Sequence, residues 1–195
     1  EAPESEAAPT LVKPLISDMD WSALQQAVSQ CQLCQLYNGS DQPLFATGNL
    51  QAEIMVIGEG HGNQEANQGG LLAGDQGALL AEMLAAIGIG CTEIYYTNLI
   101  KCSLPEERNP VTERLTCSAY LRRQIELLQP KYLLVLGEQA AQLLLDTDQP
   151  LESLRAQALC YGERQLPLIA TFSTAHLLNT PLDKRYVWQD LCRFQ

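Results

Sequence analysis

The segment 131-KYLLVLG-137 decides the fold of this chain, because its five central residues are all apolar and stand between a lysine and a glycine. A short apolar run of this kind is typical of a strand that is buried on both faces of a parallel sheet. Three other segments share the pattern: 53-EIMVIG-58, 94-IYYTN-98 and the central part of 165-QLPLIATF-172. We therefore expect four parallel strands.

Helical patterns follow each of these strands. Apolar residues recur at helical spacing in 75-DQGALLAEMLAAIGIG-90, 111-VTERLTCSAYLRRQIELLQP-130, 138-EQAAQLLL-145 and 183-DKRYVWQDLCRF-194. The glycines that close the first segment and the proline that closes the second are typical helix stops. Strands that alternate with helices predict an α/β fold, in which helices cover both faces of a doubly wound sheet.

Length and charge limit the function classes. The chain has 195 residues, 46% of them hydrophobic, and a formal net charge of −11. This length suits one well-buried core better than two domains. The negative charge disfavours tight binding to nucleic acid, since non-specific affinity for a phosphate backbone comes largely from Lys and Arg.

The N-terminal segment differs in composition from the rest. The opening 1-EAPESEAAPTLVKP-14 is rich in Ala, Pro and Glu and lacks the basic and apolar regions of a signal peptide. No apolar run approaches the roughly 20 residues that span a bilayer. We expect an acidic linker over residues 1–17 that joins a preceding segment, one domain over residues 18–195, no membrane contact and a cytoplasmic location.

Seven cysteines are an odd number in a chain without export signals, which favours metal or cluster ligation over disulfides. The motif 31-CQLC-34 suits a redox dithiol, half a zinc site or half an iron–sulfur site. Cys102 and Cys117 bracket a polar loop, and their spacing is too wide for a zinc knuckle. The alternative is that these cysteines are small buried apolar residues.

Two further features lie directly after predicted strands. The segment 57-IGEGHGNQEANQGGLLAG-74 is rich in glycine, which suits either a plain loop or a site where backbone N–H groups bind an anion. His176 follows the last strand, at the sheet edge where open α/β folds place their sites. It is either an acid/base group or an ordinary surface histidine.

Six motifs together resemble the iron–sulfur uracil-DNA glycosylases, family 4 of that superfamily. In order and spacing they cover nearly all of the chain from Trp21 to Leu191; the motifs are 31-CQLC-34, 57-IGEGHG-62, 69-GGLLAGDQGALL-80, 95-YYTNLIKC-102, 117-CSAYLRRQIELLQPKYLLVLG-137 and 171-TFSTAHLLNTPLDKRYVWQDL-191. The resemblance implies a three-layer α/β/α fold around a four-stranded parallel sheet. It also implies a [4Fe–4S] cluster on Cys31, Cys34, Cys102 and Cys117.

The resemblance implies hydrolysis of the N-glycosidic bond of deoxyuridine, with the base flipped out of the helix. Asn98 matches the asparagine that reads uracil, and Glu59 matches the acidic position that organises the pocket backbone and water. The pocket would be completed by two of these segments, 57-IGEGHG-62, called the first motif below, and 69-GGLLAGDQGALL-80, called the second. They contribute Gly58, Gly60, Gly62 and Leu72.

The chain departs from the family pattern at three positions. His61 stands where the first motif usually has proline, and Leu72 stands where a phenylalanine lies under the base. Leucine has no π-face, so stacking of about 1–3 kcal/mol per base is lost or reduced. Ser173 stands where a histidine donates to the uracil carbonyl oxygen, and loss of such a donor typically costs about 10²–10³ in rate. His61 and His176 are possible substitutes.

These departures lead to two main hypotheses. The first is a non-catalytic module with weak or absent uracil excision that contacts clamp-loader or other replisome proteins, similar to the psi subunit of bacterial DNA polymerase III. The alternative is an active family 4-type glycosylase that removes deaminated bases from DNA in base-excision repair. A redox or structural iron–sulfur protein unrelated to DNA is a third hypothesis.

Overall fold

A computed structural model of the chain describes residues 15–37, 43–62, 70–104 and 111–194, so most of the predicted linker and the loop 105–110 lie outside the described residues. The helices and strands run in the order η1 (Ile16–Asp18), α1 (Trp21–Ser29), β1 (Thr47–Gly48), β2 (Ile54–Gly58), α3 (Gly74–Ala85), β3 (Ile94–Asn98), α4 (Val111–Leu128), β4 (Tyr132–Leu136), α5 (Glu138–Leu145), α6 (Leu151–Arg155), β5 (Leu159–Tyr161), β6 (Leu166–Thr171), α7 (Thr174–Asn179), η2 (Pro181–Asp183), α8 (Lys184–Leu191) and η3 (Cys192–Phe194).

The sheet has six strands in the order β1-β3-β2-β4-β6-β5. The four predicted strands form its centre and are all parallel, as expected, so that Val56 pairs with Tyr96 on one side and with Leu134 on the other. The prediction of a four-stranded sheet needs one correction, because β1 and β5 extend it as antiparallel edges. These edge strands have only two and three residues and no buried position, so they carry no readable alternation.

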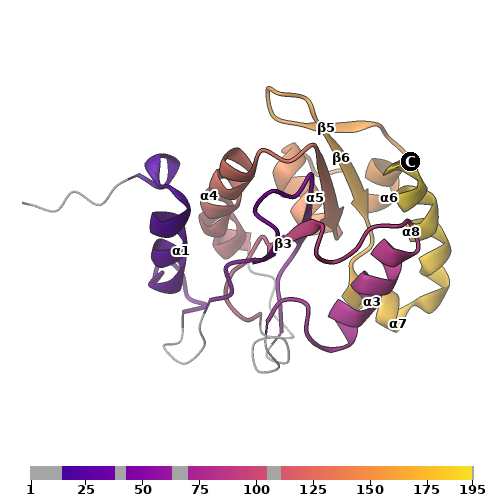
Figure 1. Ribbon diagram of the computed structural model, residues 1–195, viewed down its shortest axis with the longest axis horizontal. Coiled ribbons are helices and arrows are strands. Elements are labelled where there is room, and N and C mark those ends of the chain that lie inside the picture. Colours follow the sequence, from indigo (N-terminus) through magenta and orange to yellow (C-terminus); the bar gives the residue numbers. More distant parts are fainter. Residues whose placement is uncertain (1–14, 38–42, 63–69, 105–110, 195) are drawn as a thin grey trace, which may run out of the picture.

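Helices cover both faces of the sheet, which confirms the predicted α/β class (Figure 1). Helices α4 and α5 lie on one face, and α3, α7 and α8 lie on the other. Helix α1 packs on the outer side of α4. No helix in the described ranges is long and apolar enough to cross a membrane.

The chain changes direction at β2. From β2 it passes through α3 to the neighbour β3, and from β3 it returns through α4 to β4 on the other side of β2. The loops that leave β2 and β4 therefore run to opposite faces of the sheet and open a crevice between the carboxyl ends of these two strands. This is the position where open α/β sheets bind their ligands.

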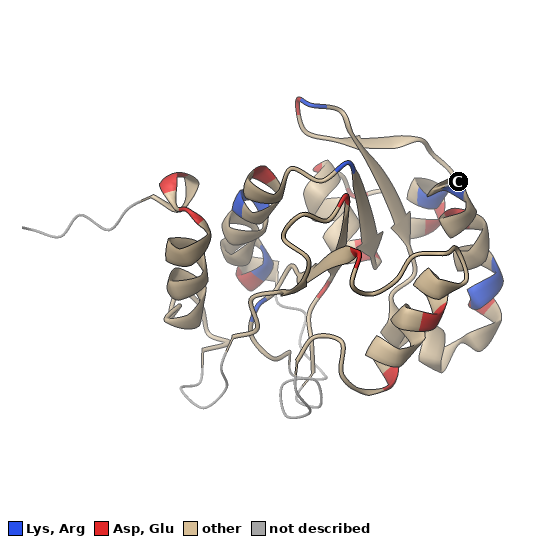
Figure 2. Cartoon of the chain, viewed as in Figure 1, with Lys and Arg blue, Asp and Glu red and all other residues tan. Residues whose placement is uncertain are grey.

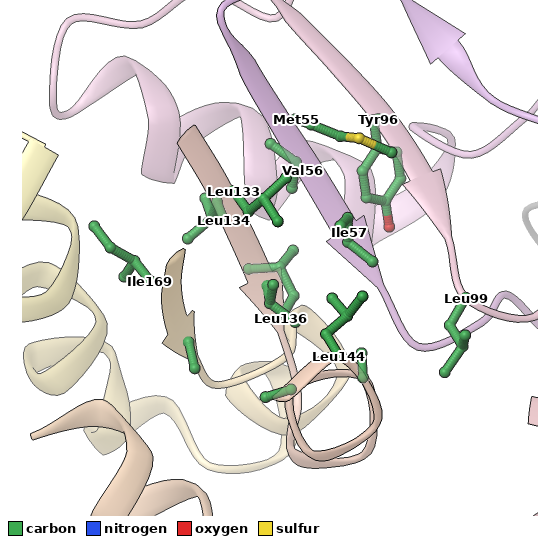
Figure 3. Close-up of a cluster of buried hydrophobic side chains, with 14 of the residues drawn as sticks. Met55, Val56, Ile57, Tyr96, Leu99, Leu133, Leu134, Leu136, Leu144 and Ile169 are labelled. Carbon is green, nitrogen blue, oxygen red and sulfur yellow. The ribbon is translucent and has the colours of Figure 1, made fainter. Parts of the chain in front are cut away.

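The predicted burial of the central strands is confirmed. Leu133, Leu134 and Val135 of β4 are fully buried although their side chains alternate between the two faces. Figure 3 shows the β2 residues Met55, Val56 and Ile57 beside them. A strand at this position has no solvent-facing side, which explains the continuous apolar run in the sequence.

The carboxyl end of β6 is fixed by a buried carboxylate. Asp190 of α8 accepts a hydrogen bond from Thr171 Oγ1 at 2.6 Å and forms an ion pair with Arg155 Nε at 2.6 Å. The side chains of Asp190 and Arg155 are only 6% and 11% exposed. The guanidinium of Arg155 also stacks on the rings of Phe172 and Tyr186, so α6, α8 and β6 are held together just before Ser173.

We predict that Asp190→Ala lowers the free energy of unfolding by about 3–5 kcal/mol, because it leaves the Arg155 guanidinium buried without a partner. Urea denaturation followed by circular dichroism measures this loss. Glu126→Ala is the control, since its ion pair with Arg123 is 58% exposed on the Glu126 side and is worth no more than about 1 kcal/mol. Equal losses in the two variants would contradict the role of Asp190.

Candidate nucleobase pocket and cysteine site

Glu59 lies in the crevice and ties β2 to helix α5. Its carboxylate Oε1 accepts a hydrogen bond from the backbone N–H of Gln139, in the first turn of α5, at 2.7 Å. Burial raises the pKa of Glu59, while the hydrogen bond from Gln139 and the charge of Arg114 oppose the rise. A carboxylate at a helix N-terminus is stabilised by the exposed N–H groups there. The side chain of Glu59 therefore supports the loop, and its Oε1 atom is already engaged.

Gly137 makes this contact possible. Its φ of 109° is a conformation that other residues rarely adopt, and a Cβ atom there would lie 2.5 Å from Glu59 Oε1. Gly137, which ends the segment 131-KYLLVLG-137, is thus required by the close approach of the loops that follow β2 and β4. Its place at the crevice follows from the strand order.

A cavity of about 190 Å³ opens at the carboxyl ends of β2, β4 and β6. Six of the predicted pocket and catalytic residues line it, namely Gly58, Glu59, Gly60, His61, Gly62 and Ser173, and Tyr96 lines it as well. Three predicted residues, Asn98, Leu72 and His176, do not line it. The structure therefore brings the first motif and the last motif together around one hollow.

Asn98 lies next to this cavity, behind Tyr96. Tyr96 lines the 190 Å³ cavity and also a second void of about 10 Å³, which Asn98 lines as well. The hydroxyl of Tyr96 donates to Asn98 Oδ1 at 3.2 Å, and Figure 3 shows this hydroxyl pointing toward the carboxyl end of the strands. Gly58 has to be glycine here, since a Cβ would lie 2.3 Å from Asn98 Oδ1. The void beside Asn98 has room for about one water molecule.

Ser173 is the N-cap of α7. Its Oγ accepts a hydrogen bond from the backbone N–H of His176 at 3.2 Å, while the residue lines the cavity. The cap uses a lone pair of the hydroxyl and leaves the O–H proton available to another acceptor. Ser173 is therefore able to donate into the cavity, although it carries no positive charge.

The two histidines differ in their surroundings. His176 stacks on Phe172 with ring centroids 4.5 Å apart, and its Nε2 pairs with Asp183 at 2.7 Å. His61 is 3% exposed, with Nε2 facing the carbonyl oxygen of Lys101 at 3.0 Å and Nδ1 facing that of Gly62 at 3.2 Å. His61 lines the cavity, but His176 does not.

Hydrogen bonds between β2 and β3 continue beyond the ends of both strands. Leu99 N donates to the carbonyl of Gly58 at 2.8 Å, Ile100 N to that of Glu59 at 3.1 Å, and Leu104 N to that of His61 at 2.9 Å. The loop that carries Cys102 is thereby joined along its length to the loop that lines the cavity.

A buried lysine lies at the centre of this ladder. Lys101 is 2% exposed, and its ammonium donates to Thr97 Oγ1, to the Asn98 carbonyl oxygen and to Gln124 Oε1, each at 2.6 Å. Burial lowers the pKa of Lys101 to about 7, and the charge of the Cys117 thiolate acts in the opposite direction. Three donors meet three acceptors, so the hydrogen-bonding capacity of the ammonium is complete.

Three of the four predicted cluster cysteines act on one another. Burial raises the pKa of the Cys117 thiol, Lys101 lowers it through a backbone hydrogen bond and its charge, and the neighbouring Cys34 and Cys31 raise it further. Cys102 is buried two residues after Ile100 in the joined loop. Within the described ranges, no group of three or more His, Cys, Asp or Glu side chains is arranged to hold a single metal ion.

The second motif packs against the first turn of α3. A Cβ at Gly77 would lie 1.9 Å from the carbonyl oxygen of Leu72, so the backbone of the motif lies directly on the helix. Leu71 is buried and lines the small void beside Asn98, whereas Leu72 is only partly buried and lines neither hollow. Of these two leucines, Leu71 therefore lies nearer to Asn98.

Sequence reasoning missed Tyr96, Lys101 and Gln124. Tyr96 shares a strand with Asn98 two residues away, and that spacing places both side chains on one face of the sheet. An isolated lysine in the apolar context 99-LIKC-102 was a signal for a buried ammonium. Gln124 gave no signal, because its partners lie in two segments that are distant from it in the sequence, at Phe45 and between Tyr95 and Lys101.

Comparisons with known proteins agree with this geometry. The model of the Uracil DNA glycosylase superfamily matches residues 45–192. The chain belongs to this superfamily. The match includes every element that lines the cavity and confirms the fold expected from the resemblance.

Several curated relatives in this superfamily carry the name Type-4 uracil-DNA glycosylase. The protein from Archaeoglobus fulgidus is 37% identical over 120 residues, which are 61% of this chain and 60% of the relative. The proteins from Pyrobaculum aerophilum and Thermotoga maritima are each 29% identical, over 90% and 86% of this chain and 93% and 89% of their own lengths.

A larger hollow in the described structure lies elsewhere. It has a volume of about 640 Å³ and is bounded by the end of α4 and the β5–β6 hairpin, at the opposite end of the sheet from the crevice. None of the residues predicted to bind the base, to act in catalysis or to hold a cluster lines this hollow. We therefore place the candidate site in the smaller cavity.

We predict that Glu59→Gln raises the melting temperature near pH 7, with a difference that shrinks toward pH 4. Burial raises the pKa of Glu59, so the folded state favours the protonated carboxyl and loses stability as the pH rises through the raised pKa. Glutamine keeps the acceptor for Gln139 without the charge. Thermal unfolding of both proteins across this pH range measures the effect; a variant less stable at pH 7 would show that the carboxylate charge itself stabilises the loop.

Proposed function

We propose that the protein is a DNA glycosylase that hydrolyses the N-glycosidic bond between a deaminated base and its sugar, and that uracil is its main substrate. The observation that carries this proposal is the single cavity that joins the first-motif glycines, Glu59 and Ser173 beside Asn98. The Type-4 names of the relatives support the same activity. They favour the glycosylase hypothesis over the non-catalytic replisome module.

In the proposed reaction, the base is flipped out of the DNA into the cavity. The bond between C1′ of the sugar and N1 of uracil breaks, and its electron pair leaves with the base. A water molecule adds to C1′ and releases a proton. Negative charge therefore develops on the uracil, and donors aimed at its oxygen atoms lower the barrier.

Each site residue has a distinct role in this proposal. Asn98 reads the polar edge of uracil once the base reaches past Tyr96, because a carboxamide offers both a donor and an acceptor. Ser173 donates its hydroxyl to the uracil oxygen. Glu59 holds the loop after β2 in place, since its Oε1 atom accepts a hydrogen bond from Gln139 at the N-terminus of α5.

The main weakness of the site is its neutral donor. Ser173 contributes a hydrogen bond without a positive charge, and the side chain of Leu72 gives no aromatic face to the base. The proposed enzyme is therefore slow compared with a site that has a histidine and a phenylalanine at these positions. These same two substitutions are the basis of the competing replisome hypothesis.

We predict that Ser173→His increases the single-turnover rate of uracil excision by about 10²-fold, since a cationic donor is restored at the departing base. The substrate is a single-stranded oligonucleotide that contains one uracil, and cleavage of the abasic product by alkali reports the rate. When Leu72→Phe is combined with Ser173→His, we expect a lower half-saturating substrate concentration, because the phenylalanine stacks on the base. Ser153→His, on the exposed side of α6, is the control.

The outcome separates the two hypotheses. Measurable excision by the native chain that rises with Ser173→His supports the glycosylase. No excision by the native chain or by the combined Ser173→His and Leu72→Phe variant would refute it and leave the interaction module, for which capture of clamp-loader subunits is the test.

DNA contact has to overcome the charge of the protein. The formal net charge is −11, and Figure 2 shows Lys and Arg mixed with Asp and Glu over α4 and α8. We therefore propose that DNA is bound weakly and that recognition of the flipped base contributes much of the affinity.

We further propose that Cys31, Cys34, Cys102 and Cys117 hold a [4Fe–4S] cluster with a structural role. Four thiols are the donor set of such clusters, and a cluster spaces its ligands more widely than a single ion does. The hydroxyl of Ser103, next to Cys102, is buried and has no hydrogen-bond partner among the described residues. An unsatisfied buried hydroxyl is costly, and a bound group with acceptor atoms would satisfy it.

We predict that the native protein is brown and contains iron and acid-labile sulfide, and that Cys102→Ala loses both. Absorbance near 400 nm and colorimetric iron and sulfide assays measure this, with about four of each atom expected per chain. Cys160→Ala, at an exposed cysteine, is the matched control and keeps the full content. Stoichiometric zinc without iron in the native protein would overturn the assignment.

A further inference from the structure

The buried ammonium of Lys101 has no role in the reaction described above. Its three acceptors are a hydroxyl, a peptide carbonyl and a carboxamide, and none of them is a carboxylate. A buried charge with neutral partners costs free energy relative to an apolar side chain. Charged groups held in this way concentrate at functional sites.

The contacts of Lys101 show what the ammonium holds in place. Its side chain turns back along its own chain to the carbonyl of Asn98, and it reaches across to Gln124 of α4. Gln124 in turn donates to Tyr95 and to the carbonyl of Phe45. The peptide of Asn98 is thereby anchored from the sheet face opposite to the pocket.

The backbone of Lys101 is engaged on both sides as well. Its carbonyl oxygen accepts from Leu44 N at 2.7 Å and faces the Nε2 atom of His61 at 3.0 Å. Its peptide also forms a hydrogen bond with the thiol of Cys117. One residue thus contacts the base-reading strand, the lining of the cavity and the cysteine site.

We infer that Lys101 is a positioning residue that fixes Asn98 for base recognition and connects the pocket to the cysteine site. This inference rests on the proposed function, because the reading role of Asn98 is itself part of that proposal. The ammonium lies behind the Asn98 peptide and does not touch the base. Its effect on activity is therefore exerted through Asn98.

The test compares Lys101→Met with the native protein. Methionine has a similar length and an apolar end, so the buried volume is kept while the three hydrogen bonds are lost. We expect the single-turnover excision rate to fall by about 10²-fold, since a displacement of about 1 Å in a positioning element has an effect of that size. We also expect faster hydrogen–deuterium exchange at the amides of Leu99 and Ile100, which bond to the pocket loop.

Two controls separate positioning from loss of stability. Lys131→Met removes an exposed ammonium that pairs with Glu53 and leaves both readouts unchanged. Leu154→Ala, in the buried face of α6, lowers the melting temperature without altering excision per folded molecule or exchange at Leu99 and Ile100. Thr97→Val removes one of the three acceptors and is the milder variant, with a smaller change in the same direction.

The readouts distinguish the two proposals. Unchanged excision and unchanged exchange in Lys101→Met overturn the positioning role, and if that variant does not fold, the same result in Thr97→Val does so. If the native protein excises no uracil but exchange at Leu99 and Ile100 still rises in Lys101→Met, the glycosylase proposal fails and the anchoring of Asn98 stands.

Discussion

The candidate site depends on hydrogen bonds that continue from β2 and β3 after both strands have ended. The carbonyls of Gly58, Glu59 and His61 accept from Leu99, Ile100 and Leu104. Because backbone groups that are removed from water need partners, two loops that pair in this way are held as one unit. The pocket lining and the cysteine loop are therefore not independent features. Any group bound by the cysteines is coupled mechanically to the place where a base would bind.

The same constraint explains where the glycines stand. Gly58 faces the Asn98 side chain and Gly137 faces the Glu59 carboxylate, each too closely for a Cβ. The glycine-rich segment after β2 admitted two interpretations, an anion-binding loop and a plain connection. Within that segment, the structure gives Gly58 a packing reason. Gly58, like Gly137 after β4, allows a polar side chain to approach the backbone at the switch point of the sheet.

The sequence predicted the four central strands and their helices correctly, because strands buried on both faces leave a continuous apolar run. It missed the edge strands, which are short and half exposed and follow from pairing that only the folded sheet provides. The cysteine set and the pocket residues were predicted from the family resemblance. The residues that contact this set were not predicted, because the contacts join distant positions. Gln124 and Lys101 are 23 positions apart, and Glu59 and Gln139 are 80 positions apart.

Ser173 shows how one side chain can serve the fold and the candidate site together. A serine is a favourable N-cap, and here its hydroxyl stabilises the first turn of α7 while its proton remains available to the cavity. The neighbouring His176 is held on Phe172 by stacking and by Asp183, on the outside of the same turn. Position 173 therefore keeps a hydrogen-bond donor that can stabilise an anion weakly. The contacts that place this donor include the hydrogen bond from Thr171 to Asp190. In the proposed glycosylase reaction, the chemistry of the side chain at this position, and not its placement, therefore limits the rate.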